Sequence, residues 1–171
     1  SKKLAVHRIL TTTRSGCATL SANTMPGARP FFSICPMTRS AISSFLRHQE
    51  PTVHGDGHQS RDFTYVGNAV QAVLRAMEST DKRCEGEVFN VAYGSRVDLL
   101  ELIGSLRNEL AKIDPAISKV GIKHIEERPG DIRDSLADIS KARDILGFAP
   151  EFDLQKGLER AVPWYVKNWG G

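Results

Sequence analysis

The stretch Pro51-Thr-Val-His-Gly-Asp-Gly-His-Gln-Ser-Arg-Asp-Phe-Thr-Tyr-Val66 decides how the rest of this sequence is interpreted. Its first four residues, 51–54, are typical of a short strand. Gly55-Asp56-Gly57 then predicts a tight turn, because glycine and aspartate tolerate the backbone conformations that turns require. A second extended segment is expected at 63–66. The stretch therefore predicts two short extended segments on either side of a turn.

Helices are expected directly before and after this stretch. The first covers 41–48 and ends at Glu50, because the residue before a proline avoids the helical region. The second runs from Asn68, a residue type that caps helix starts, to about Ser79. The apolar residues at helical spacing are Ile42, Phe45 and Leu46 in the first helix and Val70, Val73, Leu74 and Met77 in the second.

The C-terminal half continues the alternation of strands and helices. Strands are expected at 87–92 and 119–125, on either side of the clearest helix in the chain, which Pro115 ends. The apolar three-four repeat of that helix comprises Leu99, Leu102, Ile103, Leu106, Leu110 and Ile113. The residues expected to cap the remaining helices are Asp138 at the start and Gly147 at the end of 139–146, and Asp153 at the start of the last. This order predicts an α/β fold.

The segment 11–39 shows neither a helical nor a strand period. It holds three prolines and two glycines, and residues 1–49 carry seven Lys or Arg but no Asp or Glu. A structureless loop of this length inside a compact domain is unusual. Two interpretations stay open, a segment translated out of frame and a divergent but genuine loop. We accordingly divide the chain into residues 1–39 and residues 40–171.

The composition is that of one ordinary globular domain, with 40% hydrophobic and 25% charged residues. No apolar run predicts a transmembrane helix, and no basic-then-apolar start predicts a signal peptide. Cys17, Cys35 and Cys84 lack metal-type spacing, and the histidines have no ligand partners at suitable spacing. The positive charges are too scattered for a nucleic-acid arm. We expect a cytoplasmic protein without a metal site, a membrane contact or a nucleic-acid partner.

Three motifs in a fixed order carry a family resemblance. Besides 51–66 they are Gly86-Glu-Val-Phe-Asn-Val-Ala92 and Arg128-Pro-Gly-Asp-Ile-Arg-Asp-Ser-Leu-Ala-Asp-Ile-Ser-Lys-Ala-Arg-Asp-Ile-Leu-Gly-Phe148. Each is weak alone, but jointly they are specific over about residues 40–167. The sequence resembles the extended short-chain dehydrogenases/reductases of the NAD-dependent epimerase/dehydratase family. Within that family it is most similar to the UDP-glucose and UDP-N-acetylglucosamine 4-epimerases.

This resemblance implies an α/β fold that is the C-terminal, substrate-binding part of a Rossmann-type enzyme, with the N-terminal Rossmann core missing. Family members bind NAD through a Gly-x-x-Gly-x-x-Gly turn and use a Tyr-x-x-x-Lys pair, and neither the turn nor the tyrosine occurs here. Ser1-Lys-Lys-Leu-Ala-Val6 is similar to the residues that follow that tyrosine, which makes Lys2 the expected catalytic lysine. Residues 40–171 would then be the nucleotide-sugar-binding domain, and 1–39 a remnant of the Rossmann side.

The resemblance also implies substrate-binding residues. Arg61 and Arg128 match the family arginines that hold the diphosphate, a role that suits the planar fork of a guanidinium. Asp131 matches the acid that accepts hydrogen bonds from the ribose hydroxyls, and a simple turn role is the alternative. Thr52 and His54 match the stretch that lines the uracil. Without the resemblance, both arginines would be interpreted as ordinary structural or surface residues.

The expected function is that of a fragment of a UDP-sugar 4-epimerase that contributes the UDP-sugar-binding domain, with NAD bound in the complete parent. Two alternatives stay open. One is a nucleotide-sugar dehydratase or UDP-glucuronate-modifying enzyme of the same family, and the other is a non-catalytic UDP-binding module or remnant. The parent is expected to form a homodimer, whereas this chain alone is expected to be inactive and not to dimerise.

Overall fold

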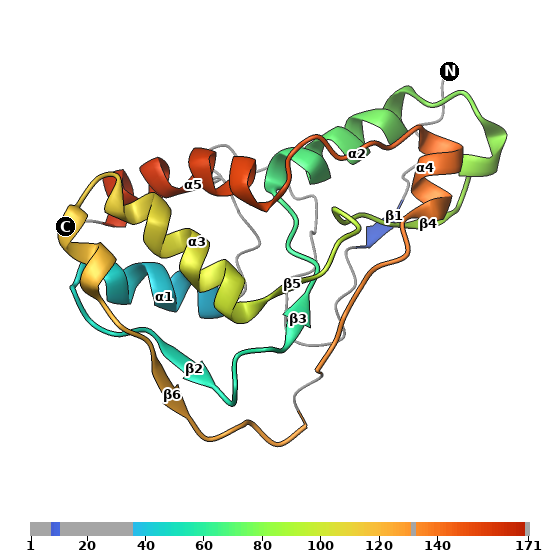
Figure 1. Ribbon diagram of the computed structural model, residues 1–171. Helices are drawn as coiled ribbons and strands as arrows, with labels where there is room; N and C mark the ends of the chain where they lie inside the picture. Colours follow the sequence, from blue (N-terminus) through green and yellow to red (C-terminus); the bar gives the residue numbers. More distant parts are fainter. Residues whose placement is uncertain (1–7, 11–35, 131–132, 170–171) are drawn as a thin grey trace.

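The computed structural model describes residues 8–10, 36–130 and 133–169 (Figure 1). The helices are α1 (Pro36–Leu46), α2 (Val66–Glu78), α3 (Leu99–Ala111), α4 (Ser140–Leu146) and α5 (Leu154–Trp169), with the 3₁₀ turns η1 (Lys82–Cys84) and η2 (Pro115–Lys119). The strands are β1 (Arg8–Leu10), β2 (Thr52–His54), β3 (Ser60–Arg61), β4 (Val88–Asn90), β5 (Val97–Asp98) and β6 (Lys123–Ile125). Lys2 and Asp131 lie outside the described residues, so their expected roles stay predictions.

The described strands form three short pairs. β1 pairs with β4 and β2 pairs with β6, both in parallel, whereas β3 pairs with β5 in antiparallel fashion. Parallel neighbours need a long crossover connection, usually helical. The crossover from β2 to β6 contains α2 and α3. The expected α/β class is therefore confirmed.

A first hydrophobic cluster lies where α1, α3 and α5 pack together (Figure 1). The Asp98 carboxylate caps α3 by accepting the N–H of Glu101 at 2.7 Å. The expected apolar face of α3 is buried from Leu99 to Leu110, and Leu106 is completely inaccessible. Ile113 departs from the expectation, because α3 ends at Ala111 and Ile113 lies beyond it with half its surface exposed.

A second hydrophobic cluster lies between α2, α4 and β4, with Phe89 of β4 fully buried. The buried face of α2 is small, since it consists of Ala69, Ala72 and Ala76 together with Asn68. This corrects the expected apolar face of α2, because the larger side chains Val70, Leu74 and Met77 are exposed. Alanines on the inner face allow the helix backbone to approach its neighbours closely.

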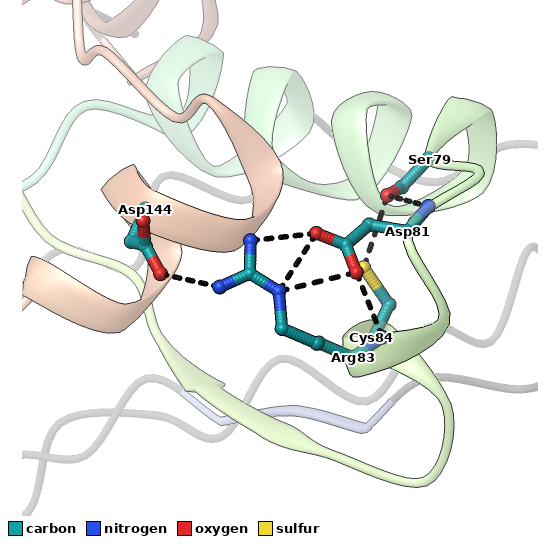
Figure 2. A network of polar contacts seen from close by, with 5 residues as sticks. All are labelled: Ser79, Asp81, Arg83, Cys84 and Asp144. Carbon is teal, nitrogen blue, oxygen red and sulfur yellow. Dashed lines mark hydrogen bonds and ion pairs between the residues drawn. The ribbon is translucent and has the colours of Figure 1, made fainter.

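A polar network joins the turn after α2 to α4 at the edge of the second cluster (Figure 2). The Arg83 guanidinium binds Asp81 within the same turn at 2.7 Å and Asp144 of α4 at 2.8 Å. Behind it, the Ser79 hydroxyl lies 3.0 Å from the sulfur of Cys84, which is buried. These contacts hold η1 against α4.

Asn68 is not the helix cap that was expected. α2 begins at Val66, so Asn68 lies in its first turn and is fully buried. Its side-chain oxygen accepts the N–H groups of Glu151 and Phe152, both at 3.0 Å, and its amide donates to the Phe152 carbonyl at 2.7 Å. Three main-chain partners far along the sequence satisfy this side chain better than one local cap would.

Some boundaries of the other elements shift from the expected ones. α1 begins five residues before the expected Ala41, at Pro36, because proline is favoured in the first turn of a helix. The expected strand at 63–66 is instead β3 at 60–61, where a pairing partner exists in β5. The strand expected at 119–125 is shortened to 123–125, because Asp114 caps η2 just before it.

The expected caps at Gly147 and Asp153 are confirmed, whereas Asp138 lies one residue before the N-cap of α4, which is Ile139 and has no side-chain cap bond. Asp138 accepts the N–H of Ser140 at 2.9 Å, directly at the start of α4. Gly147 ends α4 in the left-handed conformation with φ +61°. Asp153 accepts the N–H of Lys156 at 2.8 Å at the start of α5.

Candidate functional site

Two segments far apart in the sequence, 52–61 and 123–135, run side by side and carry most of the expected site residues. They start as the parallel pair of β2 and β6, and the N–H of Gly55 continues it by donating to the Ile125 carbonyl at 2.9 Å. At the far end, the N–H of Ser60 donates to the Arg133 carbonyl at 2.8 Å. Between these points lies the loop 126–130, which carries Arg128.

Thr52 and His54 lie in β2, at the start of this edge. Thr52 is exposed opposite Lys123, and His54 is half-buried. Nδ1 of His54 lies 3.0 Å from the main-chain oxygen of Glu126. Because a carbonyl can only accept, Nδ1 must carry the proton, which leaves Nε2 of a neutral ring as an acceptor. The ring is thus held in one orientation beside Glu126, where the 126–130 loop begins.

Arg61 lies at the other end of the edge, in β3. Its Nη1 donates to the Ser60 carbonyl at 2.8 Å and to the Arg133 carbonyl at 3.3 Å. The side chain is half-buried, so part of the guanidinium reaches the surface. Main-chain oxygens accept these two bonds, which orient the guanidinium.

Arg128 is exposed on the 126–130 loop, two residues before Gly130, which has φ +78°. Among the residues that the structure describes, it forms no hydrogen bond or ion pair. The loop is closed by an ion pair between Arg133, just after it, and Asp56, in the turn after β2, at 2.9 Å. Arg61 and Arg128 therefore belong to one edge, joined through a closed loop.

The charge on Asp56 is stabilised in this position. The N–H of His58 donates to its carboxylate at 2.9 Å, and this bond, followed by that of Arg133, holds the pKa of Asp56 below its ordinary value. The same pairing raises the pKa of Arg133. Both groups are exposed, so the contact fixes the geometry of the loop ends more than it stabilises the fold.

Asp62, the residue after Arg61, is the most buried carboxylate near this edge. Its oxygens accept the N–H groups of Tyr93 at 3.1 Å and Gly94 at 3.0 Å, and that of Ala137. Burial raises the pKa of Asp62 above its ordinary value, and the three N–H donors oppose the shift. Asp62 is partly buried, and its carboxylate organises the main chain beside Arg61.

Sequence reasoning did not assign roles to Arg133 or to Asp62. Arg133 belongs to the third motif and Asp62 to the first, but their partners lie 77 and about 31 residues away along the chain. The same holds for Ser60, whose hydroxyl donates to Asp134 at 2.6 Å. No local sequence pattern predicts such pairs. They could have been inferred only if the first and third motifs had been expected to lie side by side.

The described residues contain no group of three or more His, Cys, Asp or Glu placed to hold a metal ion. Within the same part of the chain, no helix has both the length and the apolar character needed to cross a membrane. The chemistry available at the edge is that of the Arg61 guanidinium, oriented by main-chain bonds, an exposed Arg128, a histidine ring and exposed main chain. Such a set suits a dianionic ligand that carries a planar ring.

Comparisons with known proteins agree with this chemistry. A family model described as GDP-mannose 4,6 dehydratase matches residues 14–161. A putative UDP-glucose 4-epimerase of Methanocaldococcus jannaschii is 33% identical over 127 residues, which are 74% of this chain and 38% of that protein. UDP-glucuronic acid decarboxylase 3 of Arabidopsis thaliana is 36% identical over 68% of this chain and 31% of its own length.

Among solved structures, a UDP-glucuronic acid 4-epimerase of Bacillus cereus, in complex with UDP-glucuronic acid and NAD, superposes with a TM-score of 0.65. It is 29% identical, and the match covers 78% of this chain and 40% of that enzyme. The chain thus spans well under half the length of the relatives it matches.

Proposed function

The chain belongs to the NAD-dependent epimerase/dehydratase family of extended short-chain dehydrogenases/reductases, and on this premise we propose that it forms the UDP-sugar-binding part of a nucleotide-sugar 4-epimerase. The observation that supports the proposal is the pairing of 52–61 with 123–135, two segments of which the first carries Arg61 and the second Arg128. Relatives that act on UDP-glucose and UDP-glucuronic acid support the choice of ligand.

In this proposal Arg61 and Arg128 hold the diphosphate from its two sides. The main-chain bonds of Arg61 orient its guanidinium before ligand arrives, which lowers the entropy lost on binding. His54, with its ring fixed by Glu126, lies at the end of the edge where the uracil would lie. An epimerase must keep the diphosphate fixed while the sugar turns over, so these residues position the substrate and transfer no proton.

NAD accepts and returns hydride in this family. The described residues contain no glycine-rich turn between a strand and a helix, which is the usual dinucleotide diphosphate site. These residues therefore do not supply that site by themselves. The proposed role of Lys2 as catalytic lysine and of Asp131 as ribose ligand remains part of the proposal.

A second candidate is another reaction on the same substrate class, because a UDP-glucuronic acid decarboxylase is 36% identical over 117 residues. The diphosphate edge serves either reaction. The two candidates differ only in what happens to the sugar, which chromatography of the products from UDP-glucose and UDP-glucuronic acid distinguishes in the complete enzyme.

The binding proposal is tested by calorimetric titration of the chain with UDP at low salt. We expect saturable binding that Arg128→Ala weakens on the order of tenfold or more, because charged hydrogen bonds to a diphosphate are among the strongest polar contacts. Arg75→Ala, which removes an exposed arginine from the far end of α2, is the matched control and should bind like the wild type.

Uridine lacks the diphosphate and should bind weakly to both the wild type and Arg128→Ala, with no difference between them. Equal UDP affinities for Arg128→Ala and Arg75→Ala would overturn the assignment of Arg128 to diphosphate binding. Absence of any UDP binding by the folded wild type would overturn the binding role of this chain.

A further inference from the structure

The two hydrophobic clusters of this fold are connected by segments that leave one and enter the other. Four such connections lie within the described residues: 62–65 between β3 and α2, 91–96 between β4 and β5, 133–139 before α4, and 147–153 between α4 and α5. Figure 1 shows the two groups of helices on opposite sides of β3 and β5. Their relative orientation depends on how these connections are held.

Asp62 links three of the four connections through hydrogen bonds. It belongs to the first, accepts the N–H groups of Tyr93 and Gly94 in the second, and accepts that of Ala137 in the third. Gly94 has φ +86°, a conformation that glycine adopts freely, and Thr64 shares the Tyr93 N–H at 3.1 Å. One carboxylate thus ties three main-chain segments at a point next to Arg61.

Asn68 links α2 to the fourth connection through hydrogen bonds. It extends from the first turn of α2 to the main chain of Glu151 and Phe152, through two accepted bonds and one donated bond. The ring of Tyr65 packs on Phe152 beside it, with centroids 5.0 Å apart. Neither hydrophobic cluster includes Asn68, although no part of its surface is accessible.

We propose that Asp62 and Asn68 are positioning residues that set the angle between the two clusters, and thereby the direction in which the Arg61 edge faces. Asn68 is fully buried and Asp62 is partly buried, and both side chains bond main-chain groups. A rotation of the clusters would break several of these bonds at once. Apolar contacts alone are less directional and would permit small rotations.

The orientation claim stands by itself, whereas its consequence for ligand affinity depends on the proposed function. If the chain binds UDP-sugars, a change of the angle between the two clusters changes the direction in which the Arg61 edge faces. Residues that touch no ligand change binding by about three- to thirtyfold when they alter such coupling. We therefore expect losses of UDP affinity of that order in variants of either residue.

Residual dipolar couplings of backbone amides measure the angle directly in the full chain. In the wild type, one alignment tensor should fit the amides of α3 and α5 together with those of α2 and α4. Asp62→Asn keeps the shape but puts an NH₂ group opposite main-chain donors. Asn68→Asp keeps the acceptor and removes the donor to Phe152. Both variants should require separate tensors for the two clusters.

Glu109→Gln is the matched control. Glu109 is also buried and polar, but it bonds Lys112 and Gln155 within the first cluster only. It should lower stability and leave a single tensor. A single, wild-type tensor in whichever of Asp62→Asn and Asn68→Asp folds would overturn the proposal, even if that variant were less stable. Separate tensors without UDP binding by the wild type would support the proposal and count against the proposed function alone.

Discussion

Nη2 of Arg133 lies 2.9 Å from Oδ2 of Asp56, and this ion pair closes the loop that carries Arg128. The two residues come from different motifs, separated by 77 positions. Their contact joins the chain shortly after Arg128 to the turn after β2. The position of Arg128 therefore depends on a contact in which it takes no part.

The first prediction concerns this pair. Asp56→Ala should weaken UDP binding by a few-fold, because opening the loop adds an ordering cost to binding without removing a ligand contact. Calorimetric titration at low and high salt measures the effect, which should shrink as salt screens the pair in the wild type. Asp144→Ala removes an equally exposed ion pair on α4 and is the control. An identical loss in both variants would contradict the role of loop closure.

A pair of glycines tests the backbone conformation of two helices. Gly147 has φ +61° at the end of α4, so Gly147→Ala should destabilise the protein by about 1 kcal/mol, although open space surrounds the added methyl. Gly104 lies inside α3 with equally open space, so Gly104→Ala should stabilise it by about 0.5–1 kcal/mol. Urea denaturation followed by circular dichroism gives both values, and changes of the same sign would be inconsistent with these conformations.

The first cluster should depend strongly on Leu106. This side chain is completely buried on α3, so Leu106→Ala should lower the free energy of unfolding by about 2–5 kcal/mol through lost burial and a residual cavity. Leu74 on α2 is half-exposed, and Leu74→Ala should change the free energy of unfolding by no more than about 0.5 kcal/mol. Trp164 fluorescence in urea reports the transition. A small effect at Leu106 would argue against the packing of α3 on α5.

Acid should weaken the network around Arg83 (Figure 2). The Arg83 side chain, followed by its N–H, holds the pKa of Asp81 below its ordinary value of 3.8. An acid with a lowered pKa in the folded state contributes stability above its unfolded pKa and loses it as the pH falls through the folded pKa. The contribution is thus constant near neutrality and decreases below about pH 4.

The measurement is the urea midpoint between pH 6 and pH 2.5. The midpoint of Asp81→Asn should fall less steeply below pH 4 than that of the wild type, because asparagine does not titrate. Arg83→Gln should show the same reduced slope, whereas the exposed Arg75→Gln should not. Parallel curves for wild type and Asp81→Asn would show that the pairing does not persist in solution.

Much of the local structure followed from short-range patterns. The three-four repeat of α3, the cap at Asp153 and the left-handed glycine at 147 are encoded within a few residues of the sequence. The motif at 51–66 likewise predicted the strand of Thr52 and His54 and the turn after it. Family membership followed from the order of the three motifs.

The tertiary structure decided which motifs meet. Asn68 has the local character of a cap, yet its partners are at 151 and 152, and α2 buries alanines where larger apolar residues were expected. Asp62 ties segments about 31 and 75 residues away, and Arg133 closes a loop on Asp56. Hydrogen bonds and ion pairs require groups within a few ångströms of each other in space, whatever the number of residues between them in the sequence. For that reason the sequence by itself determined the elements and the family, whereas the geometry of the Arg61 edge depended on contacts that exist only after folding.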